Sequence, residues 1–275
     1  YELFKRHDKF NEDDFIKLKK HCDFVNIEFS STAFDYISLD FIDNLVTFHK
    51  ISSSDITNIP FIEKIAKKGK PILISTGAST LGEIDNAVNT IRQFGVEEIC
   101  IMHCILCYPT SINSANLSMI NSLKRTYPNN IIGYSDHTMP SGDLISLTTA
   151  YLLGAQVLEK HFTFNKDLPG NDHYHSMDEN DLKNFNKSIK QMLNLIGNEY
   201  IKKPIDEEFK SRLNARRSIV LKESVKKGQF FDQNHITFKR PGTGISPEHV
   251  NFLDGRKYCK DLDYDEILTW DSLYK

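Results

Sequence analysis

The sequence has few cysteines, no long apolar run and almost no excess of charge of either sign. Its five cysteines form no array of paired C-x-x-C motifs of the kind that binds structural zinc, and we interpret them as reduced thiols of a cytoplasmic protein. No apolar stretch approaches the roughly 20 residues that a membrane helix needs, so we expect no membrane partner. The net charge of -3 excludes a strong basic field and the recruitment of nucleic acid that depends on one.

Short apolar runs alternate with longer amphipathic stretches along the first two thirds of the chain. Apolar runs bounded by polar residues are typical of buried parallel strands, and the stretches between them are typical of helices. The pattern predicts six βα units after a first helix at residues 11–22, and therefore an α/β fold. The predicted strands lie at residues 24–29, 46–51, 71–74, 99–104, 131–134 and 156–158.

Polar side chains follow each predicted strand at its carboxyl end. In a (β/α)8 TIM barrel the loops after the strands meet at one face, which holds the active site. This one-sided placement favours the barrel, and because six strands are two short of eight, we expect the first two to lie upstream of Tyr1 in a longer protein. The polar side chains are Thr32, Lys50, Ser53, Ser75, Tyr108, Ser135, His137, Glu159 and His161.

The last third of the chain has a different composition. We expect the barrel domain at residues 1–200, a charged linker at 201–215 and a small β-rich domain at 216–275, where short apolar runs alternate with Gly and Pro turns. A helix at residues 178–195 is expected to close the barrel domain. Its apolar side chains recur at helical spacing, which predicts a place in the core for Leu182, Phe185, Ile189, Met192 and Leu193.

Residues 133–177 concentrate the groups that bind metals or transfer protons. Because side chains alternate along a strand, Ser135 and His137 would share one face, as would Glu159 and His161. Two imidazoles that converge at neighbouring strand ends suit Mn²⁺, Fe²⁺ or Zn²⁺ and leave positions for water and substrate. The alternative is that each histidine is an ordinary hydrogen-bonded polar residue. The segment holds four of the ten histidines: His137, His161, His173 and His175.

The other strand ends offer one cation and several hydroxyl groups. Lys50 supplies a positive charge, and nearby hydroxyls supply donors, which is the composition of a pocket for a phosphate or carboxylate. Taken singly, each Ser or Thr is more often a helix cap. An anion pocket beside an open metal site indicates a phosphorylated or carboxylated substrate and Lewis-acid chemistry. The hydroxyls belong to Thr32, Ser53, Ser75 and Ser135.

The chain also resembles the sialic acid synthase family, which includes the N-acetylneuraminate, legionaminate and pseudaminate synthases. The resemblance covers nearly the whole chain in order, and the two histidines together with KRPG are its most specific part. It is carried by KISS at 50–53, ISTG at 74–77, HC at 103–104, YPT at 108–110, GYSDHT at 133–138, EKHFT at 159–163, PGNDH at 169–173, SM at 176–177 and KRPG at 239–242.

The resemblance implies a (β/α)8 barrel followed by an antifreeze-like SAF domain of the β-clip type. It implies condensation of phosphoenolpyruvate with an N-acetylmannosamine-like sugar to give a nine-carbon 2-keto acid and phosphate. By position, His137 and His161 would hold Mn²⁺, which would polarise the open-chain aldehyde and position the attacking water. Phosphoenolpyruvate would be held by Thr32, Lys50, Ser53, Ser75 and Ser135.

The same resemblance implies catalytic residues that face the sugar and the metal. One of them, Arg240, would come from the partner subunit of a domain-swapped homodimer, where its planar fork can clamp sugar oxygens or a carboxylate. The catalytic residues so implied are Asp55, Tyr108, Glu159, Asp172 and Arg240.

The chain departs from the family pattern at three places. The family's glutamate after the first strand and lysine after the second would lie upstream of Tyr1, so we expect this chain to be a fragment of an active enzyme and incomplete by itself. Leu106 stands where sialate synthases commonly have a polar residue, which leaves the acceptor sugar open. His175 is unusual, and we favour an exposed position for it over a contact in the site.

Two other functions remain as alternatives. One is a different phosphoenolpyruvate-condensing synthase that makes a seven- or eight-carbon keto sugar acid, against which the KRPG domain argues. The other is a noncatalytic carbohydrate-binding or ice-binding module, against which the charged residues of the last domain argue. Only the enzyme alternatives require metal and phosphoenolpyruvate.

Overall fold

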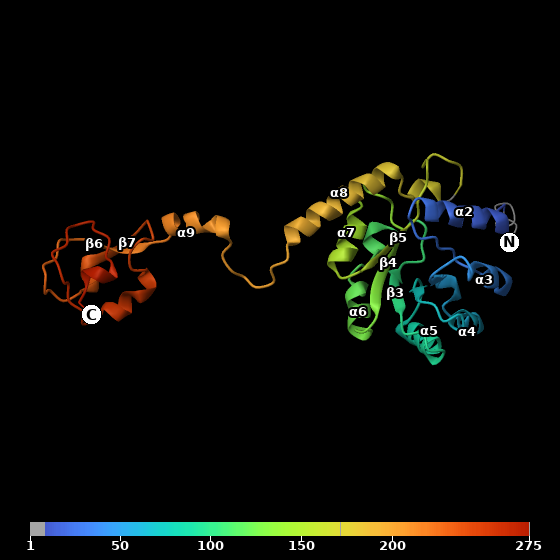
Figure 1. Cartoon of the computed structure of the whole chain (residues 1–275), viewed down its shortest axis with the longest axis horizontal. Helices are drawn as coiled ribbons and strands as arrows, with labels where there is room; N and C mark the ends of the chain where they lie inside the picture. The colour runs from blue at the N-terminus through green and yellow to red at the C-terminus, as the bar shows by residue number, and fades with distance from the viewer. Residues whose placement is uncertain (1–8, 171, 275) are drawn as a thin grey trace. The chain divides into compact units, whose positions relative to one another are not determined.

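The computed structural model describes residues 9–170 and 172–274 of the chain (Figure 1). The described residues fall into two compact units, which divide between Gly197 and Asn198. Each unit has a hydrophobic core of its own. Among the described helices, none combines the length and the apolar character that crossing a membrane requires.

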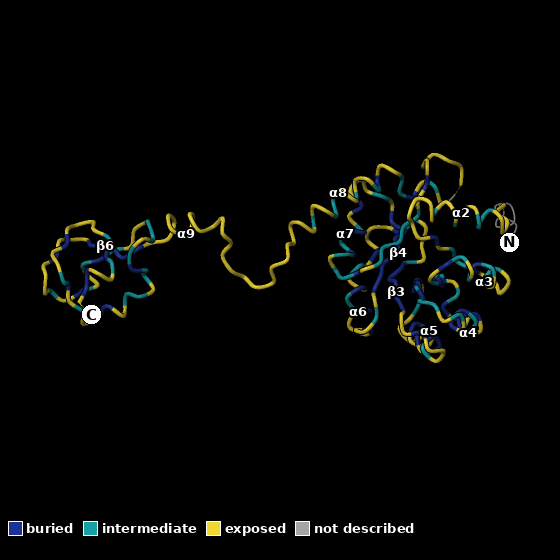
Figure 2. The backbone as a smooth tube through the Cα atoms, viewed as in Figure 1, coloured by how far each residue is buried: buried dark blue, intermediate teal, exposed yellow. Residues whose placement is uncertain are grey.

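The first unit is organised around a parallel sheet of five strands within the described residues. The strands are hydrogen-bonded in sequence order, and a helix follows each of the first four, which confirms the α/β prediction. The sheet interior is apolar, and every residue of the middle strand β3 is buried, as the dark β3 and β4 traces show (Figure 2). The strands are β1 (His49–Ile51), β2 (Ile72–Ser75), β3 (Ile99–Cys104), β4 (Ile131–Asp136) and β5 (Val157–Lys160).

Helix α5 of the first unit packs an apolar face into the main core. Ile84, Val88 and Ile91 recur at helical spacing on α5 and are all buried. Thr80 caps this helix in a capping box with Glu83, so two of its free N–H groups are satisfied. The helices are α2 (Glu12–Phe24), α3 (Tyr36–Ile42), α4 (Ile59–Ala66), α5 (Leu81–Gln93), α6 (Met119–Thr126), α7 (Ile145–Leu152) and α8 (Glu179–Ile196).

The strand predicted at residues 24–29 is not formed, and this prediction was wrong. The backbone N–H of Val25 bonds to His21 O, and that of Ile27 bonds to Cys22 O, so the start of the run continues the end of α2. Asn26 has a left-handed φ of 58°, which an extended strand cannot contain. Apolar composition alone did not reveal that these N–H groups are used by the preceding helix.

The apolar face of α8 is buried less than predicted. Phe185 packs against the main core, but Leu193 is 43% exposed. Leu182, Ile189 and Met192 are half-buried. The helix itself is therefore confirmed, whereas the predicted burial of its whole apolar face was too high.

The second unit is small and β-rich. It contains the helix α9 (Phe209–Ala215), followed by the antiparallel strands β6 (Ser218–Leu221) and β7 (Ile236–Lys239). Isolated bridges such as Val225 with Leu262 extend the pairing around a core that includes Ile219 and Tyr258. Residues 201–215, predicted as a linker, include α9, whose residues are exposed.

Candidate active site

The ends of β4 and β5 sort their polar side chains onto two faces. The strands pair in parallel with Ser135 opposite Glu159 and Asp136 opposite Lys160. Because side chains alternate along a strand, the first pair points to one side of the sheet and the second pair to the other. Ser135 Oγ donates to Glu159 Oε1 at 2.5 Å on its side.

On the opposite side Asp136 and Lys160 form a fully buried ion pair of 2.8 Å. Asp136 also accepts hydrogen bonds from Tyr134 Oη, Thr138 N and Ser146 Oγ at 2.7–2.8 Å. Burial by itself would raise the pKa of Asp136, but the charge of Lys160 and these donors outweigh it and lower the pKa. This saturated pair fixes the strand ends and leaves no capacity for a substrate.

The side that holds Ser135 and Glu159 also receives Lys50 from β1. Its Nζ donates to Ser75 Oγ at 2.6 Å and lies 3.8 Å from Glu159 Oε2. Lys50 and Ser75 are largely buried, so their charge and dipole act in a medium that screens them little. The structure thus brings together one cation, two hydroxyls and one carboxylate from β1, β2, β4 and β5.

Ser53 reaches the same cluster from the 3-10 turn after β1, Ser53–Asp55. The Gly77 N–H donates to Ser53 Oγ at 2.9 Å, and a Cβ atom at Gly77 would come within 2.8 Å of that oxygen. Only glycine therefore allows this approach. Cys104 lies beside them, with its Sγ 3.7 Å from Ser53 Oγ, and burial raises the pKa of its thiol. Neither period nor composition marks Gly77 and Cys104 as members of the site.

The histidines at the ends of β4 and β5 lie close to each other. The rings of His137 and His161 have centroids 5.3 Å apart and are nearly perpendicular. His137 Nδ1 donates to the carbonyl oxygen of Ile105 at 2.9 Å, since a carbonyl can only accept, and this leaves its Nε2 lone pair free for a metal. Tyr108 covers His137, with ring centroids 4.1 Å apart.

The electrostatics keep these rings neutral. Burial lowers the pKa of both His137 and His161, and for His161 the neighbouring His137 lowers it further. Burial raises the pKa of Tyr108 to about 12, so its hydroxyl stays protonated and can donate. Neutral imidazoles are the form in which histidine binds metal ions.

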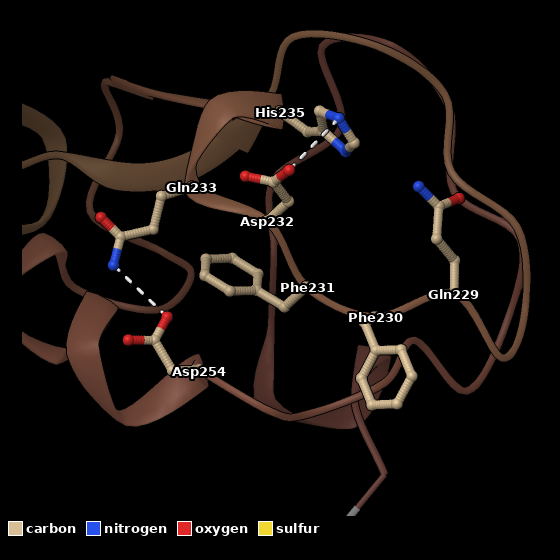
Figure 3. Close-up of a pocket in the computed structure, with 7 residues that line it drawn as sticks. All are labelled: Gln229, Phe230, Phe231, Asp232, Gln233, His235 and Asp254. Atoms are coloured by element: carbon tan, nitrogen blue, oxygen red, sulfur yellow. Dashed lines mark hydrogen bonds and ion pairs between the residues drawn. The ribbon is translucent and has the colours of Figure 1, made fainter.

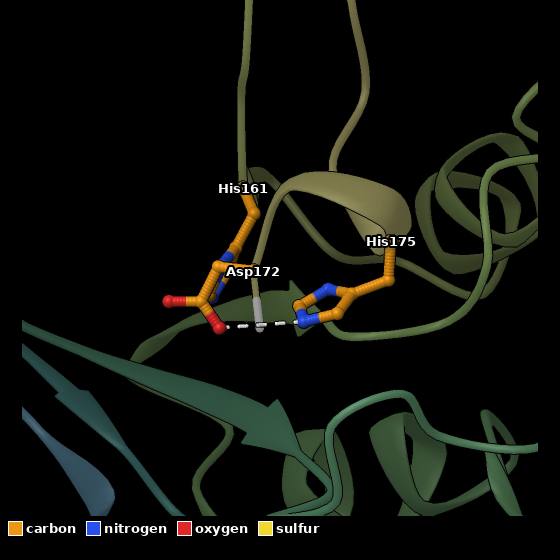
Figure 4. Close-up of side chains that lie close together, drawn as sticks. All are labelled: His161, Asp172 and His175. Carbon is orange, nitrogen blue, oxygen red and sulfur yellow. Dashed lines mark ion pairs between the residues drawn. The ribbon is translucent and has the colours of Figure 1, made fainter. Parts of the chain in front are cut away.

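His175 is buried in the cluster, which contradicts our expectation of an exposed side chain. It belongs to a 3-10 turn, His173–His175, and is only 1% exposed. Its ring centroid lies 5.2 Å from that of His161, and Asp172 Oδ1 lies 3.4 Å from its Nε2 (Figure 4). One ligand atom from each of these three residues lies within 4.8 Å of the other two. The periodicity of strands and helices cannot predict a side-chain direction in so short a turn.

His173, in the same turn, is engaged elsewhere. Its Nδ1 lies 2.8 Å from Thr163 Oγ1. It thereby ties the turn to the loop after β5, which places Asp172 and His175 beside His161.

Three predicted site residues are not linked to this cluster by contacts of the described chain. Within residues 9–170 and 172–274, the hydroxyl of Thr32 has no hydrogen-bond partner. Asp55 accepts a hydrogen bond from Asn58 Nδ2 at 3.2 Å. Arg240 belongs to the second unit, where it is exposed. Their roles in the site stay predictions.

The second unit has a pocket of about 620 Å³ between its loops (Figure 3). Gln233 Nε2 donates to Asp254 Oδ1 at 3.4 Å across it, and His235 lies 3.8 Å from Asp232 Oδ2. Its lining includes two carboxylates and no lysine or arginine, so it is poorly suited to an anionic substrate. The titratable cluster of the first unit is the better candidate for catalysis.

Parallel βα units with a lysine, hydroxyls, a carboxylate and histidines gathered at the carboxyl ends of the strands define an α/β enzyme of the barrel type. Residues 1–200 match the NeuB family and residues 216–273 match the SAF domain. The chain belongs to the NeuB family.

Individual relatives match most of this chain. The N,N'-diacetyllegionaminic acid synthase of Campylobacter jejuni is 39% identical over 90% of this chain and 74% of its own. The N-acetylneuraminate-9-phosphate synthase of Drosophila melanogaster is 31% identical over 99% of this chain and 79% of its own. The crystal structure of N-acetylneuraminic acid synthetase from Leptospira borgpetersenii, in complex with citrate, superposes with a TM-score of 0.66 at 30% identity, covering 74% of this chain and 69% of that one.

Proposed function

We propose that the protein is a sialic-acid-type synthase that condenses phosphoenolpyruvate with an N-acylated mannosamine-like sugar to a nine-carbon 2-keto acid and phosphate. The observation that carries this proposal is the contact of Lys50 with Ser75 and Glu159, whose carboxylate charge acts on both His137 and His161. Membership of the NeuB family and the names of the relatives support the reaction class.

The anion pocket would hold phosphoenolpyruvate. Lys50 supplies a positive charge from β1, and its Nζ donates to Ser75 Oγ. The hydroxyl protons of Ser53, Ser75 and Ser135 would donate to the bound phosphoenolpyruvate. Charge-assisted hydrogen bonds of this kind are about twice as strong as neutral ones. Glu159, at hydrogen-bond distance from Ser135, is placed to accept or return a proton next to the bound phosphate.

The histidine cluster fits a divalent metal. Two neutral imidazoles, a carboxylate and a buried ring without hydrogen bonds suit Mn²⁺, Fe²⁺ or Zn²⁺, and we propose that His137 and His161 hold Mn²⁺. Such an ion supplies a Lewis acid for the aldehyde oxygen of the sugar. Tyr108, whose hydroxyl stays protonated, covers the cluster and would orient the sugar as a donor, and Asp172 would accept from its hydroxyls.

Residues outside the cluster would complete the enzyme. We propose that Thr32 completes the phosphoenolpyruvate pocket, that Asp55 contacts the sugar, and that Arg240 enters the site of a partner subunit in a homodimer with exchanged SAF domains. A cytoplasmic location fits an enzyme that uses phosphoenolpyruvate.

The test is release of phosphate from phosphoenolpyruvate by the complete gene product, with N-acetylmannosamine and several other acylated hexosamines, in the presence of Mn²⁺. Release should require both the sugar and the metal. His161→Ala should lower the rate by about 10³-fold, because a metal Lewis acid contributes several kcal/mol and each 1.36 kcal/mol is a factor of ten.

The matched control is Lys183→Ala on the exposed face of α8, where the side chain is 68% exposed and should not matter. Absence of phosphate release with every acylated hexosamine, from a folded protein loaded with metal, would contradict the proposed reaction.

A further inference from the structure

His175 presents an unusual combination of burial and missing partners. Its side chain is fully buried, yet neither Nδ1 nor Nε2 makes a hydrogen bond in the described structure. A buried polar atom without a partner lowers stability, and native proteins hold few of them. A ligand that completes these nitrogens would remove the penalty.

The surroundings of His175 identify the kind of ligand. One atom each of His161, Asp172 and His175 lies within 4.8 Å of the others, close enough for a single ion to bridge them. Figure 4 shows these side chains converging from the end of β5 and from the turn beyond the loop after it. His137 and Tyr108 border the same space, with the His137 ring centroid 5.3 Å from that of His161 and the Tyr108 ring centroid 6.1 Å from that of His175.

The neighbouring carboxylate does not satisfy His175 by itself. Asp172 Oδ1 lies 3.4 Å from His175 Nε2, which does not give a hydrogen bond, and the Asp172 side chain is 64% exposed. An exposed carboxylate is compensated by water and gains little from such a pair. The other nitrogen of the ring, Nδ1, lacks even this contact.

We infer that His175 is a further imidazole ligand of the divalent metal at His161, together with Asp172, so that the site is richer in nitrogen than a pair of histidines alone. Imidazole suits Zn²⁺, Co²⁺ and Ni²⁺ better than it suits Mn²⁺, which prefers oxygen ligands. The extra ring should therefore raise affinity for Co²⁺ and Zn²⁺ more than affinity for Mn²⁺. The inference rests on the proposed function only for the role of the ion in the reaction.

The test is titration of the metal-free complete gene product with CoCl₂ and with MnCl₂, without substrates, monitored by calorimetry and by the visible absorption of Co²⁺. The variant is His175→Leu, and the matched control is His21→Leu, which removes an exposed histidine of α2. Loss of groups that only orient metal ligands costs 10- to 100-fold in metal affinity, so loss of a ligand should weaken Co²⁺ binding by at least about tenfold.

A second readout separates a ligand from a structural residue. Removing two unpaired nitrogens should leave the unfolding temperature of metal-free His175→Leu unchanged or higher, while the stabilisation by Co²⁺ decreases. His21→Leu should bind Co²⁺ with wild-type affinity. If His175→Leu does not fold, His175→Gln decides by the same titration.

The inference is overturned if the His175 variants bind Co²⁺ within about twofold of the wild type, if both histidine variants weaken it equally, or if the wild type binds no Co²⁺. If the His175 variants bind Co²⁺ as the wild type does and the enzyme releases phosphate, His175 is not a ligand and the proposed synthase reaction stands. If the His175 variants bind Co²⁺ more weakly but the wild type releases no phosphate with any acylated hexosamine, His175 is a metal ligand and the proposed synthase reaction is wrong.

Discussion

The two faces at the ends of β4 and β5 carry similar polar residues that differ in how completely they are hydrogen-bonded. On one face Asp136 accepts four hydrogen bonds, one of them from the buried Lys160. On the other, Lys50 lies 3.8 Å from Glu159, and His175 has two unpaired nitrogens. The hydrogen-bonded pair of Asp136 and Lys160 holds the strand ends in place, and the side with the unpaired nitrogens of His175 retains the capacity to bind.

This contrast explains why charge and burial alone do not mark a site. Buried polar groups are normally saturated, and saturation is what makes Asp136 a structural residue although it is a carboxylic acid like Glu159. In the sheet, Glu159 pairs with Ser135, and Asp136 is the next residue after Ser135. Because side chains alternate along a strand, Glu159 points to the side of the proposed site and Asp136 points to the opposite side.

The largest effect that tests the contrast should come from Asp136→Asn. The substitution leaves the ammonium of Lys160 buried without its counter-charge, and breaking a buried pair costs about 3–5 kcal/mol. The free energy of unfolding, measured with urea at pH 7 in the presence of a chelator, should fall by that amount. The exposed counterpart Asp23→Asn, which removes a surface pair with Lys19, should change it by at most about 1 kcal/mol.

The same pair predicts a dependence on pH. The pKa of Asp136 is lowered in the folded protein, so its stabilisation is present above the pKa of the unfolded chain, about 3.9, and is lost as the pH falls through the folded value. The difference in unfolding free energy between wild type and Asp136→Asn should therefore shrink below about pH 4. A difference that stays constant or grows in acid would show that the charge pair is not its source.

Period and composition predicted the sheet and one side of the site, but not the local turns. Alternation predicted that His137 and His161 lie on the side of Ser135 and Glu159. The register of β4 with β5 pairs Ser135 with Glu159, and the two histidine rings lie 5.3 Å apart. The strand at 24–29 was wrong because its backbone N–H groups bond to the end of α2, which a count of apolar residues does not register. The burial of His175 was missed because a three-residue turn has no period that sets a side-chain direction.

An intermediate effect should come from Lys50→Met on the binding face. The variant loses the charged hydrogen bonds to phosphoenolpyruvate, worth about 1.5–3 kcal/mol, or roughly 10- to 150-fold. We expect this loss in kcat/KM for phosphoenolpyruvate, with the KM of the sugar little changed, in steady-state assays of phosphate release. Lys64→Met on α4, where the side chain is 41% exposed, serves as the control. If only the KM of the sugar changed, Lys50 would bind the sugar and not phosphoenolpyruvate, which contradicts the prediction.

The smallest effect should be a difference in the KM of phosphoenolpyruvate between alanine variants of two glycines near the N-terminus of α5. A Cβ at Gly77 would meet Ser53 Oγ at 2.8 Å, Leu106 Cβ at 3.1 Å and Cys104 Sγ at 3.2 Å. At Gly82 the nearest atom is Thr80 Oγ1 at 4.0 Å. Gly77→Ala must therefore displace the hydroxyl that Gly77 N–H holds, at a cost of about 1 kcal/mol, the low end for overpacking, because Ser53 can rotate. The KM of phosphoenolpyruvate should rise about fivefold in Gly77→Ala. Gly82→Ala should leave it unchanged, and an equal rise in both variants would mean that the start of α5, rather than the position of Ser53, controls the anion pocket.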